Sequence, residues 1–388
     1  MPRMRKRSDH TELNDQETSM NPPPILHAVA TDTFKTALTS ERLMSVKRAY
    51  NARRVAASDL ASLLTDTGAV PRAGDLVLAR VERIGKHPAL ELSDSRRSTL
   101  FVGDEVLVAY AARYAPDQFE ARVPDSLGPC HLAASGGVAA EVVSRRAGTT
   151  APTELRPLGL VLDPNGQRVN LARTALPPGT AQDPRPLTLA SLGTSMNAGK
   201  TTSAAHLIHG LKQAGMRVGG AKITGTGSGN DPGLLSDAGA DWVLDFTHCG
   251  HASTFGLGLE ELLGILYTVQ AHMHAKAVDV LVLEVADGLL QQETALLLRS
   301  DKFRQRVDGC IFSSGEAMGA IAGAEWLHSQ KLPLLALSGA MTRSPLSSAE
   351  AAAATGIKTL GLEDLRDPTT VRDLLARATR NGVAMEAA

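Results

Sequence analysis

The chain has 388 residues, enough for two domains of ordinary size, each with its own core. It is 43% hydrophobic and 21% charged with a formal net charge of −1, so it lacks the broad positive charge of proteins that bind nucleic acid or anionic membranes. Aromatic residues make up only 3%, which leaves little material for stacking on bases. Its three cysteines are far apart, which suits a reducing compartment, and no apolar run is long enough to span a bilayer. We therefore expect a cytoplasmic protein that binds neither nucleic acid nor membrane.

The N-terminal end is polar and predicts a disordered tail over residues 1–24. A basic start is followed by the polar stretch from Ser8 to Ser19, where a signal peptide would be apolar. Met20 is an alternative start of the chain.

Residues 25–175 predict an N-terminal α+β domain. The apolar spacing over 31–65 is helical, and from Gly74 it changes to the alternation of strands. The expected elements that follow are strands 75–82, 90–93, 98–101 and 105–110, a loop and helix within 125–148, and a hairpin over 158–171. Short, closely spaced strands favour a β-barrel or a sandwich. A barrel of the oligonucleotide-binding kind is the alternative, and its groove would be lined by Arg80, Arg83, Lys86, Arg96 and Arg97.

Residues 176–186 are rich in proline and predict a linker, so we place the second domain at 187–388. Here apolar strands alternate with amphipathic helices. The expected strands are 187–192, 217–224, 242–246, 279–285, 308–313, 332–338 and 357–361, and the expected helices are 200–214, 259–275, 288–300, 317–329, 347–355 and 368–380. This alternation predicts an α/β fold with a doubly wound, mainly parallel sheet and a ligand at the carboxyl ends of its strands.

The segment between the first strand and the first helix of that domain predicts a phosphate-binding loop. Its residues are Gly193, Thr194, Ser195, Met196, Asn197, Ala198, Gly199, Lys200, Thr201 and Thr202. Backbone N–H groups at the start of a helix bind phosphates, the lysine reaches the outer phosphates, and the hydroxyl of Thr201 suits Mg²⁺. The first glycine stands one place earlier than in the strict phosphate-loop pattern.

Three further segments carry polar residues at predicted strand ends. Lys222 precedes a loop of small residues, Glu284 follows an apolar strand, and the segment from Asp245 to Thr254 contains two histidines and a cysteine. A carboxylate at the end of a buried strand is typical of Mg²⁺ binding. For the His and Cys segment a Zn²⁺ site is the alternative to a mobile substrate loop.

Residues 187–363 resemble dethiobiotin synthetase and its relatives in the cobyric-acid-synthase branch of phosphate-loop proteins. The similarity lies in the early Gly193-Thr194, in Lys222 before its small-residue loop, in Ser236-Asp237-Ala238 and in Glu284. The resemblance implies that Thr201, Asp237 and Glu284 hold Mg²⁺. It also implies that Lys200 binds the terminal phosphates and that Lys222 stabilises the substrate anion or the transferring phosphoryl group.

The sequence departs from that family at several positions. Met196 replaces a threonine, Asn197 an acidic residue, Val285-Ala286-Asp287-Gly288 a glycine pair, and Gly339 the asparagine that reads adenine. We therefore do not predict biotin synthesis.

The leading hypothesis is an enzyme that uses Mg²⁺ and ATP to phosphorylate a carboxylate or carbamate of a small molecule, with GTP as the other candidate nucleotide. The candidate substrate contacts are Thr224, Thr226, His251 and Asp287. The alternatives are a switch or cofactor-maturation factor driven by nucleotide hydrolysis, and a nucleic-acid kinase. A homodimer is compatible with the sequence.

Overall fold

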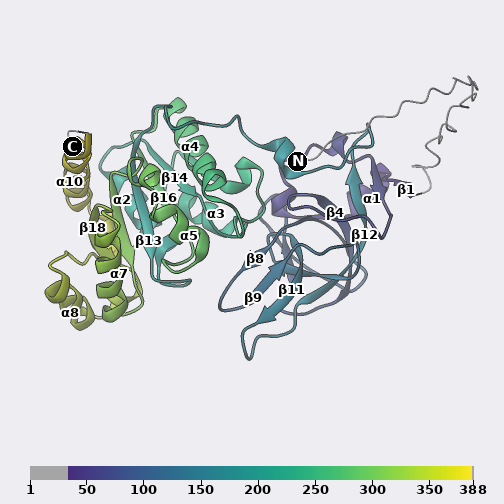
Figure 1. The fold of residues 1–388 in the computed structure, drawn as a ribbon, viewed down its shortest axis with the longest axis horizontal. Coiled ribbons are helices and arrows are strands. Elements are labelled where there is room, and N and C mark those ends of the chain that lie inside the picture. The colour runs from purple at the N-terminus through teal and green to yellow at the C-terminus, as the bar shows by residue number, and fades with distance from the viewer. Residues whose placement is uncertain (1–33, 387–388) are drawn as a thin grey trace, which may run out of the picture. The chain divides into compact units, whose positions relative to one another are not determined.

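Six parallel strands form the sheet of the C-terminal half, with its first strand near the centre (Figure 1). Their order is β15-β14-β16-β13-β17-β18. In chain order they are β13 (Leu187–Gly193), β14 (Val218–Lys222), β15 (Trp242–Asp245), β16 (Val280–Glu284), β17 (Gly309–Ser313) and β18 (Leu334–Ser338). Because all six run the same way, their carboxyl ends share one edge of the sheet. The expected α/β fold with a mainly parallel sheet is confirmed.

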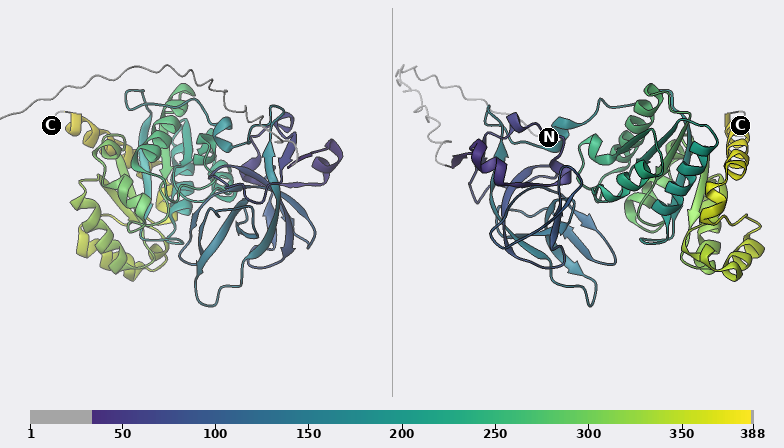
Figure 2. Two further views of the ribbon diagram at one scale, coloured as in Figure 1. Left: turned by 45° about the vertical axis from the view of Figure 1, so that its right-hand side comes forward. Right: turned by 180° about the vertical axis from the view of Figure 1, so that it is seen from behind.

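Helices cover both faces of this sheet (Figure 2). They are α2 (Lys200–Gln213), α3 (Asn230–Asp237), α4 (Leu259–Ala275), α5 (Gln292–Leu298), α6 (Asp301–Arg304), α7 (Ala317–Ser329), α8 (Pro345–Thr355), α9 (Leu362–Arg366) and α10 (Pro368–Glu386). Along β16, Leu281 and Leu283 pack with α4, α5 and α7, whereas Val280 and Val282 pack with α2, α3 and α10. This two-sided burial explains why the strands read as continuous apolar runs.

The N-terminal half is a β module built around a closed ring of five strands. The ring runs β4-β7-β11-β10-β12 and returns to β4, with β7 and β11 parallel and the other pairs antiparallel. The strands of the module are β1 (Lys35–Ala37), β2 (Lys47–Arg48), β3 (Ser62–Leu64), β4 (Leu76–Arg83), β5 (Ala89–Glu91), β6 (Arg97–Thr99), β7 (Glu105–Tyr110), β8 (Arg113–Tyr114), β9 (Phe119–Arg122), β10 (Cys130–Ala134), β11 (Val138–Arg145) and β12 (Thr153–Leu162). The expected barrel is therefore present.

Alternate residues of the ring strands form two apolar layers. On β4, Val77 and Val81 join residues of all four other ring strands in one core, whereas Leu76 and Leu78 pack under the segment from Leu38 to Leu63. Two of the five basic residues that would line an oligonucleotide groove form ion pairs instead: Arg80 with Glu105 and Arg83 with Glu154.

Several expected elements were wrong. Residues 40–45 form one short helix, α1 (Ser40–Ser45), and the rest of 34–65 contains short strands and single turns instead of long helices. The helix expected within 125–148 is replaced by β10 and β11, whose alanines favour helix locally but are held by ladder partners on both sides. The strand expected at 357–361 is only a single bridge between Thr359 and Leu337.

The structure is a computed structural model that describes residues 34–386, with side chains described as far as residue 379, so the predicted tail at 1–24 lies outside it. Residues 176–186 form no helix or strand and run beside α4, where the N–H of Gly179 donates to Thr268 Oγ1 at 3.0 Å. None of the helices in the described range is both long and apolar enough to cross a membrane.

Candidate nucleotide site

The loop between β13 and α2 has the backbone geometry of a phosphate-binding loop. Gly199 precedes α2 with φ of +107°, a left-handed conformation that glycine adopts most readily. A Cβ on Gly199 would lie 3.0 Å from the Cα of Gly339, so a side chain there would require the neighbouring backbone to shift. The first N–H groups of α2 have no acceptor within the helix, and the helix dipole adds positive potential at that end. This end of α2 is suited to a phosphate.

Lys200 is the first residue of α2, and its side chain folds back over the loop. The Nζ atom donates to the carbonyl oxygen of Ser195 at 2.7 Å, and the residue is only 5% exposed. Burial lowers the pKa of Lys200, and the carboxylates of Glu284 and Asp287 oppose that shift. An ammonium group bound to a neutral carbonyl can exchange that partner for a phosphate oxygen, because charge-assisted hydrogen bonds are the stronger ones.

Thr201 and Glu284 meet because β13 and β16 are neighbours in the sheet. The hydroxyl of Thr201 donates to Glu284 Oε1 at 3.0 Å. Glu284 is 1% exposed, and its Oε2 is buried without a hydrogen-bond partner among the described residues. Burial raises the pKa of Glu284, while the ammonium group of Lys222 opposes the shift. A hydroxyl and a carboxylate with a free oxygen are ligands that suit Mg²⁺.

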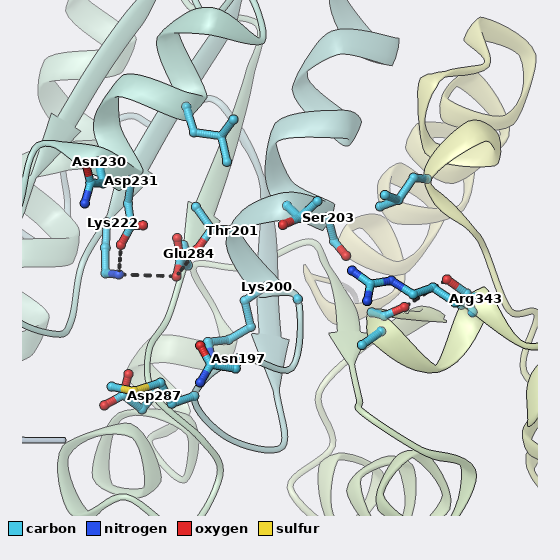
Figure 3. A pocket seen from close by; sticks show the side chains of 18 residues that line it. Asn197, Lys200, Thr201, Ser203, Lys222, Asn230, Asp231, Glu284, Asp287 and Arg343 are labelled. Carbon is cyan, nitrogen blue, oxygen red and sulfur yellow. Dashed lines mark hydrogen bonds and ion pairs between the residues drawn. The ribbon is translucent and has the colours of Figure 1, made fainter. Parts of the chain in front are cut away.

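Lys222 ends β14, the strand on the other side of β16, and lies between two carboxylates. Its Nζ forms an ion pair with Asp231 and lies 3.4 Å from Glu284 Oε1. Burial alone would lower the pKa of Lys222, but these two carboxylates outweigh burial and raise it above its ordinary value. Lys222 is therefore a largely buried cation between acidic partners at the carboxyl edge of the sheet (Figure 3).

These groups line one cavity of about 530 Å³ at the mouth of the loop. Figure 3 shows Lys200 and Asn197 near Asp287, the Lys222 ion pairs on one side, and Arg343 on the other. The lining residues are Met196, Asn197, Gly199, Lys200, Thr201, Thr202, Ser203, Lys222, Asn230, Asp231, Leu234, Glu284, Asp287, Gly339, Ala340, Thr342, Arg343 and Leu362. The lysines and carboxylates thus lie on one side of Arg343, which is accompanied by Ser203, Thr342 and Leu362 in the lining.

The remaining loop residues face a second, adjacent cavity of about 360 Å³. It is lined by Thr194, Ser195, Met196, Asn197, Ala198, Ser314, Gly315, Glu316 and Gly319. Gly193 closes β13, where an added Cβ would come within 2.9 Å of the Ser313 carbonyl oxygen. The predicted loop is thus brought together as one structural unit between two cavities.

Asp237 does not join the other predicted metal ligands. It is the last residue of α3, is exposed, and does not line the cavity, whereas Asp231 in the first turn of α3 does. The two residues are separated by more than one turn of helix, so only one of them reaches the strand edge. The acidic position in the structure is therefore Asp231 instead of Asp237.

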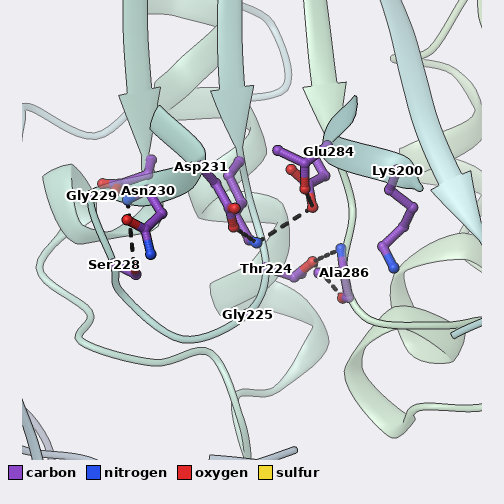
Figure 4. Close-up of polar contacts among 12 residues, drawn as sticks. Lys200, Thr224, Gly225, Ser228, Gly229, Asn230, Asp231, Glu284 and Ala286 are labelled. Carbon is purple, nitrogen blue, oxygen red and sulfur yellow. Dashed lines mark hydrogen bonds and ion pairs between the residues drawn. The ribbon is translucent and has the colours of Figure 1, made fainter. Parts of the chain in front are cut away.

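Three of the four predicted substrate contacts lie elsewhere. Thr224 is buried, donates to the Ala286 carbonyl oxygen at 2.7 Å and accepts from the Ala286 N–H at 2.8 Å (Figure 4). Thr226 pairs with Ser253, and His251 has a pKa lowered by burial; neither lines either cavity. Asp287 does line the larger cavity.

The His and Cys segment instead surrounds Asp245. His248 Nδ1 lies 2.8 Å from Asp245 Oδ1, and burial raises the pKa of Cys249 to about 12. Both residues are thus partly buried next to Asp245, which also accepts a hydrogen bond from Tyr50.

Sequence reasoning missed the contacts from the β module. Glu91, 2% exposed, accepts from Ser228 Oγ at 3.0 Å and from the N–H of Gly229 at 2.9 Å. Figure 4 shows Ser228 and Gly229 on the loop that leads to Asp231. Asn197 Nδ2 also donates to Asp117 Oδ2 at 3.3 Å. An acidic residue at the end of a short strand was the only signal of the Glu91 contact.

Comparison with protein-family models finds no match, and neither does comparison with curated proteins. Among solved structures, the 54 kDa signal recognition particle protein from Aeropyrum pernix, in complex with GDP, is 20% identical with a TM-score of 0.37; the match covers 54% of this chain and 51% of that one. The signal recognition particle receptor FtsY from Elizabethkingia anophelis, in complex with GDP, is 13% identical over 52% and 67% of the two chains, with a TM-score of 0.34. FtsY from Thermotoga maritima is 19% identical over 50% and 69%, with a TM-score of 0.33.

This chain thus spans about half the length of the first of these proteins. All three TM-scores are low, so the conclusions below rest on the residues of this chain. The central strand, its glycine-bounded loop and the helix after it define the phosphate-loop class of α/β fold.

Proposed function

We propose that this protein binds a nucleoside triphosphate with Mg²⁺ in the larger cavity and transfers its terminal phosphoryl group to water. The observation that carries this proposal is the convergence of Lys200, Lys222 and the Thr201–Glu284 pair at the mouth of one loop. Phosphoryl transfer depends mainly on positioning and on positive charge around the terminal phosphate. Two buried lysines and a hydroxyl–carboxylate pair supply both.

The residues present fit Mg²⁺. The Oε2 atom of Glu284, which is buried without a partner among the described residues, and the Thr201 hydroxyl would hold the ion. Lys222 links Glu284 to Asp231, because its ammonium group pairs with both carboxylates. Mg²⁺ commonly takes one or two carboxylates and completes its shell with water and phosphate oxygens. When bound, the ion would neutralise charge on the outer phosphates.

Nucleotide binding would change the partners of Lys222. A terminal phosphate competes with Asp231 and Glu284 for this ammonium group, because all three are anionic acceptors. Asp231 is in the first turn of α3, and the loop just before α3 is bound by Glu91 of the β module. Loss of the Lys222–Asp231 pair would therefore release the start of α3, next to the loop that Glu91 of the β module binds. This continuity favours a nucleotide-driven switch.

A second candidate is phosphorylation of a carboxylate or carbamate of a small molecule. The adjacent cavity of about 360 Å³, which shares Met196 and Asn197 with the larger one, is the observation that favours it. The product would be an acyl phosphate, and Lys222 would offset the charge of the acceptor. A homodimer remains an expectation from the sequence.

One experiment separates these candidates. The full chain is incubated with Mg²⁺ and either ATP or GTP, alone and with a metabolite extract, and nucleoside diphosphate and metabolite masses are measured. We expect diphosphate formation without extract and no change in metabolite mass. Diphosphate formed only with extract, together with a metabolite that gains a phosphoryl group, would favour the second candidate. Absence of both binding and turnover with either nucleotide would contradict the site itself.

The two acidic ends of α3 give a matched pair of variants. Asp231→Asn is expected to raise the Mg²⁺ needed for half-maximal turnover on the order of tenfold, because the cavity loses a carboxylate that acts on Lys222 and Glu284. Asp237→Asn, at the exposed end of the same helix, is expected to leave it unchanged. A Mg²⁺ titration of turnover decides, and a larger effect at Asp237 would restore the ligand set that the sequence predicted.

A further inference from the structure

Asp287 is a carboxylate that the binding scheme above does not use. It follows β16 by three residues, is largely buried and lines the larger cavity with Lys200 and Lys222. Figure 3 shows it near Asn197 and Lys200 of the phosphate loop. The cavity has three carboxylates, and the other two are engaged: Asp231 by Lys222, and Glu284 by Thr201 and Lys222. Within residues 34–379, Asp287 makes no hydrogen bond or ion pair.

We propose that Asp287 is the general base of nucleotide hydrolysis, taking the proton of the attacking water. The proposal rests on the hydrolytic function inferred above and assigns it one more catalytic residue. Asp287 is an unengaged carboxylate in the same cavity as Lys200 and Lys222, which would face the terminal phosphate of a bound nucleotide. A water beside that phosphate would find its proton acceptor there.

The charged groups around Asp287 come from both halves of the chain. Lys200 of α2, Lys222 of β14 and Arg113 of β8 favour the ionised carboxylate, whereas Asp117 of the loop after β8 disfavours it. Burial is the largest influence and raises the pKa of Asp287 above that of an ordinary carboxyl. A base is most effective when its pKa approaches the working pH while it is still ionised. Burial moves the pKa of Asp287 towards the working pH, and the three cations favour the ionised form.

The proton and electron balance is simple. The water O–H bond breaks and its proton goes to an Oδ atom of Asp287, while the water oxygen bonds to the γ-phosphorus. The bond from that phosphorus to the bridging oxygen breaks, and the nucleoside diphosphate leaves with the electron pair. The proton on Asp287 then passes to solvent, so no further reactant is needed.

The proposal also distinguishes between acceptors. A carboxylate acceptor is already deprotonated at neutral pH and needs no base, whereas water does. A base at Asp287 therefore favours hydrolysis over formation of an acyl phosphate.

The test uses the full chain and three measurements: the turnover number as a function of pH, nucleotide affinity by calorimetry, and thermal unfolding. Asp287→Asn keeps the shape of the side chain but cannot take the proton. We expect its turnover number to fall by about 10² to 10⁴-fold and the acid limb of the pH profile to disappear. Nucleotide affinity is expected to stay the same or to tighten, because a negative charge near the phosphates is removed.

Asp287→Glu retains a carboxylate displaced by one methylene group. It is expected to keep part of the turnover and the acid limb, and it decides the question if Asp287→Asn does not fold. The assignment would be overturned if the turnover of Asp287→Asn stayed within about threefold of the parent. It would also be overturned if Asp287→Glu lost its turnover and acid limb as completely as Asp287→Asn. Either result would leave the proposed function intact. A parent protein that hydrolyses neither ATP nor GTP would remove both proposals.

Discussion

Replacing Lys200 by alanine is expected to abolish nucleotide turnover, with a loss of about 10² to 10³-fold or more. The ammonium group of Lys200 is buried at the start of α2, and its one hydrogen bond in the described residues is to the Ser195 carbonyl oxygen. A hydrogen bond to a charged group contributes about 1.5 to 3 kcal/mol, so nucleotide affinity should fall roughly 10- to 150-fold as well. Calorimetric titration and a turnover assay measure the two effects.

The matched control is Lys212→Ala near the other end of the same helix. Lys212 pairs with Asp241 at 2.8 Å on the surface, where such pairs contribute little to stability. Its loss should leave nucleotide binding and turnover unchanged. Removing Lys200 deletes an ammonium group from a cavity wall, so thermal unfolding should shift only slightly. A folded Lys200→Ala protein with the parent's affinity and turnover would show that this loop does not bind phosphate.

The C-terminal half was predictable because its local and tertiary preferences agree. Continuous apolar runs gave β13 and β16, and the helical periodicity of 259–275 coincides with α4. In the β module the local preferences of the residues and their tertiary partners disagree. Ala133, Ala134, Ala139 and Ala140 favour a helix, yet β10 and β11 close a barrel through partners distant in sequence. Local periodicity carries no information on such pairings.

The same distinction applies to the candidate site. Lys200, Thr201 and Glu284 were identifiable because each stands at the end of an element with strong periodicity, and neighbouring parallel strands bring such ends together. Asp231 was missed because α3 is short, and the resemblance in Ser236-Asp237-Ala238 pointed to the end of α3 that does not line the cavity. Glu91 and Asp117 belong to another part of the chain, so only the fold shows that they contact the loops of this site.

Asp245 is the most densely bonded buried carboxylate between the β module and the parallel sheet. Its Oδ2 accepts from the Tyr50 hydroxyl at 3.0 Å, and its Oδ1 accepts from the N–H of Thr247 at 3.0 Å. Arg53 lies 3.6 Å away, and its guanidinium also donates to Thr247 Oγ1. Burial alone would raise the pKa of Asp245, but His248, Arg53 and Thr247 outweigh it and lower the pKa to about 2.

Asp245→Ala is expected to lower the free energy of unfolding by about 3 to 5 kcal/mol, because it leaves the buried cation and hydroxyls without their acceptor. Urea unfolding at neutral pH measures the loss. The exposed side chain of Asp373 in α10 makes no hydrogen bond in the described part of the chain, so Asp373→Ala should change the free energy by less than about 0.5 kcal/mol.

The pH dependence of unfolding provides an independent check on Asp245. Its folded pKa of about 2 lies below the ordinary value of 3.8, so the folded state binds this proton less readily than the unfolded state. The stabilisation is therefore complete above about pH 4 and is lost as the pH falls towards 2, a change of about 2 kcal/mol at about 1.4 kcal/mol per pKa unit. Since Asp245→Ala removes the titrating group, the parent and the variant should converge in stability across that interval. A constant difference for Asp245→Ala down to pH 2 would mean that its carboxylate gains nothing from His248, Arg53 and Thr247 on folding.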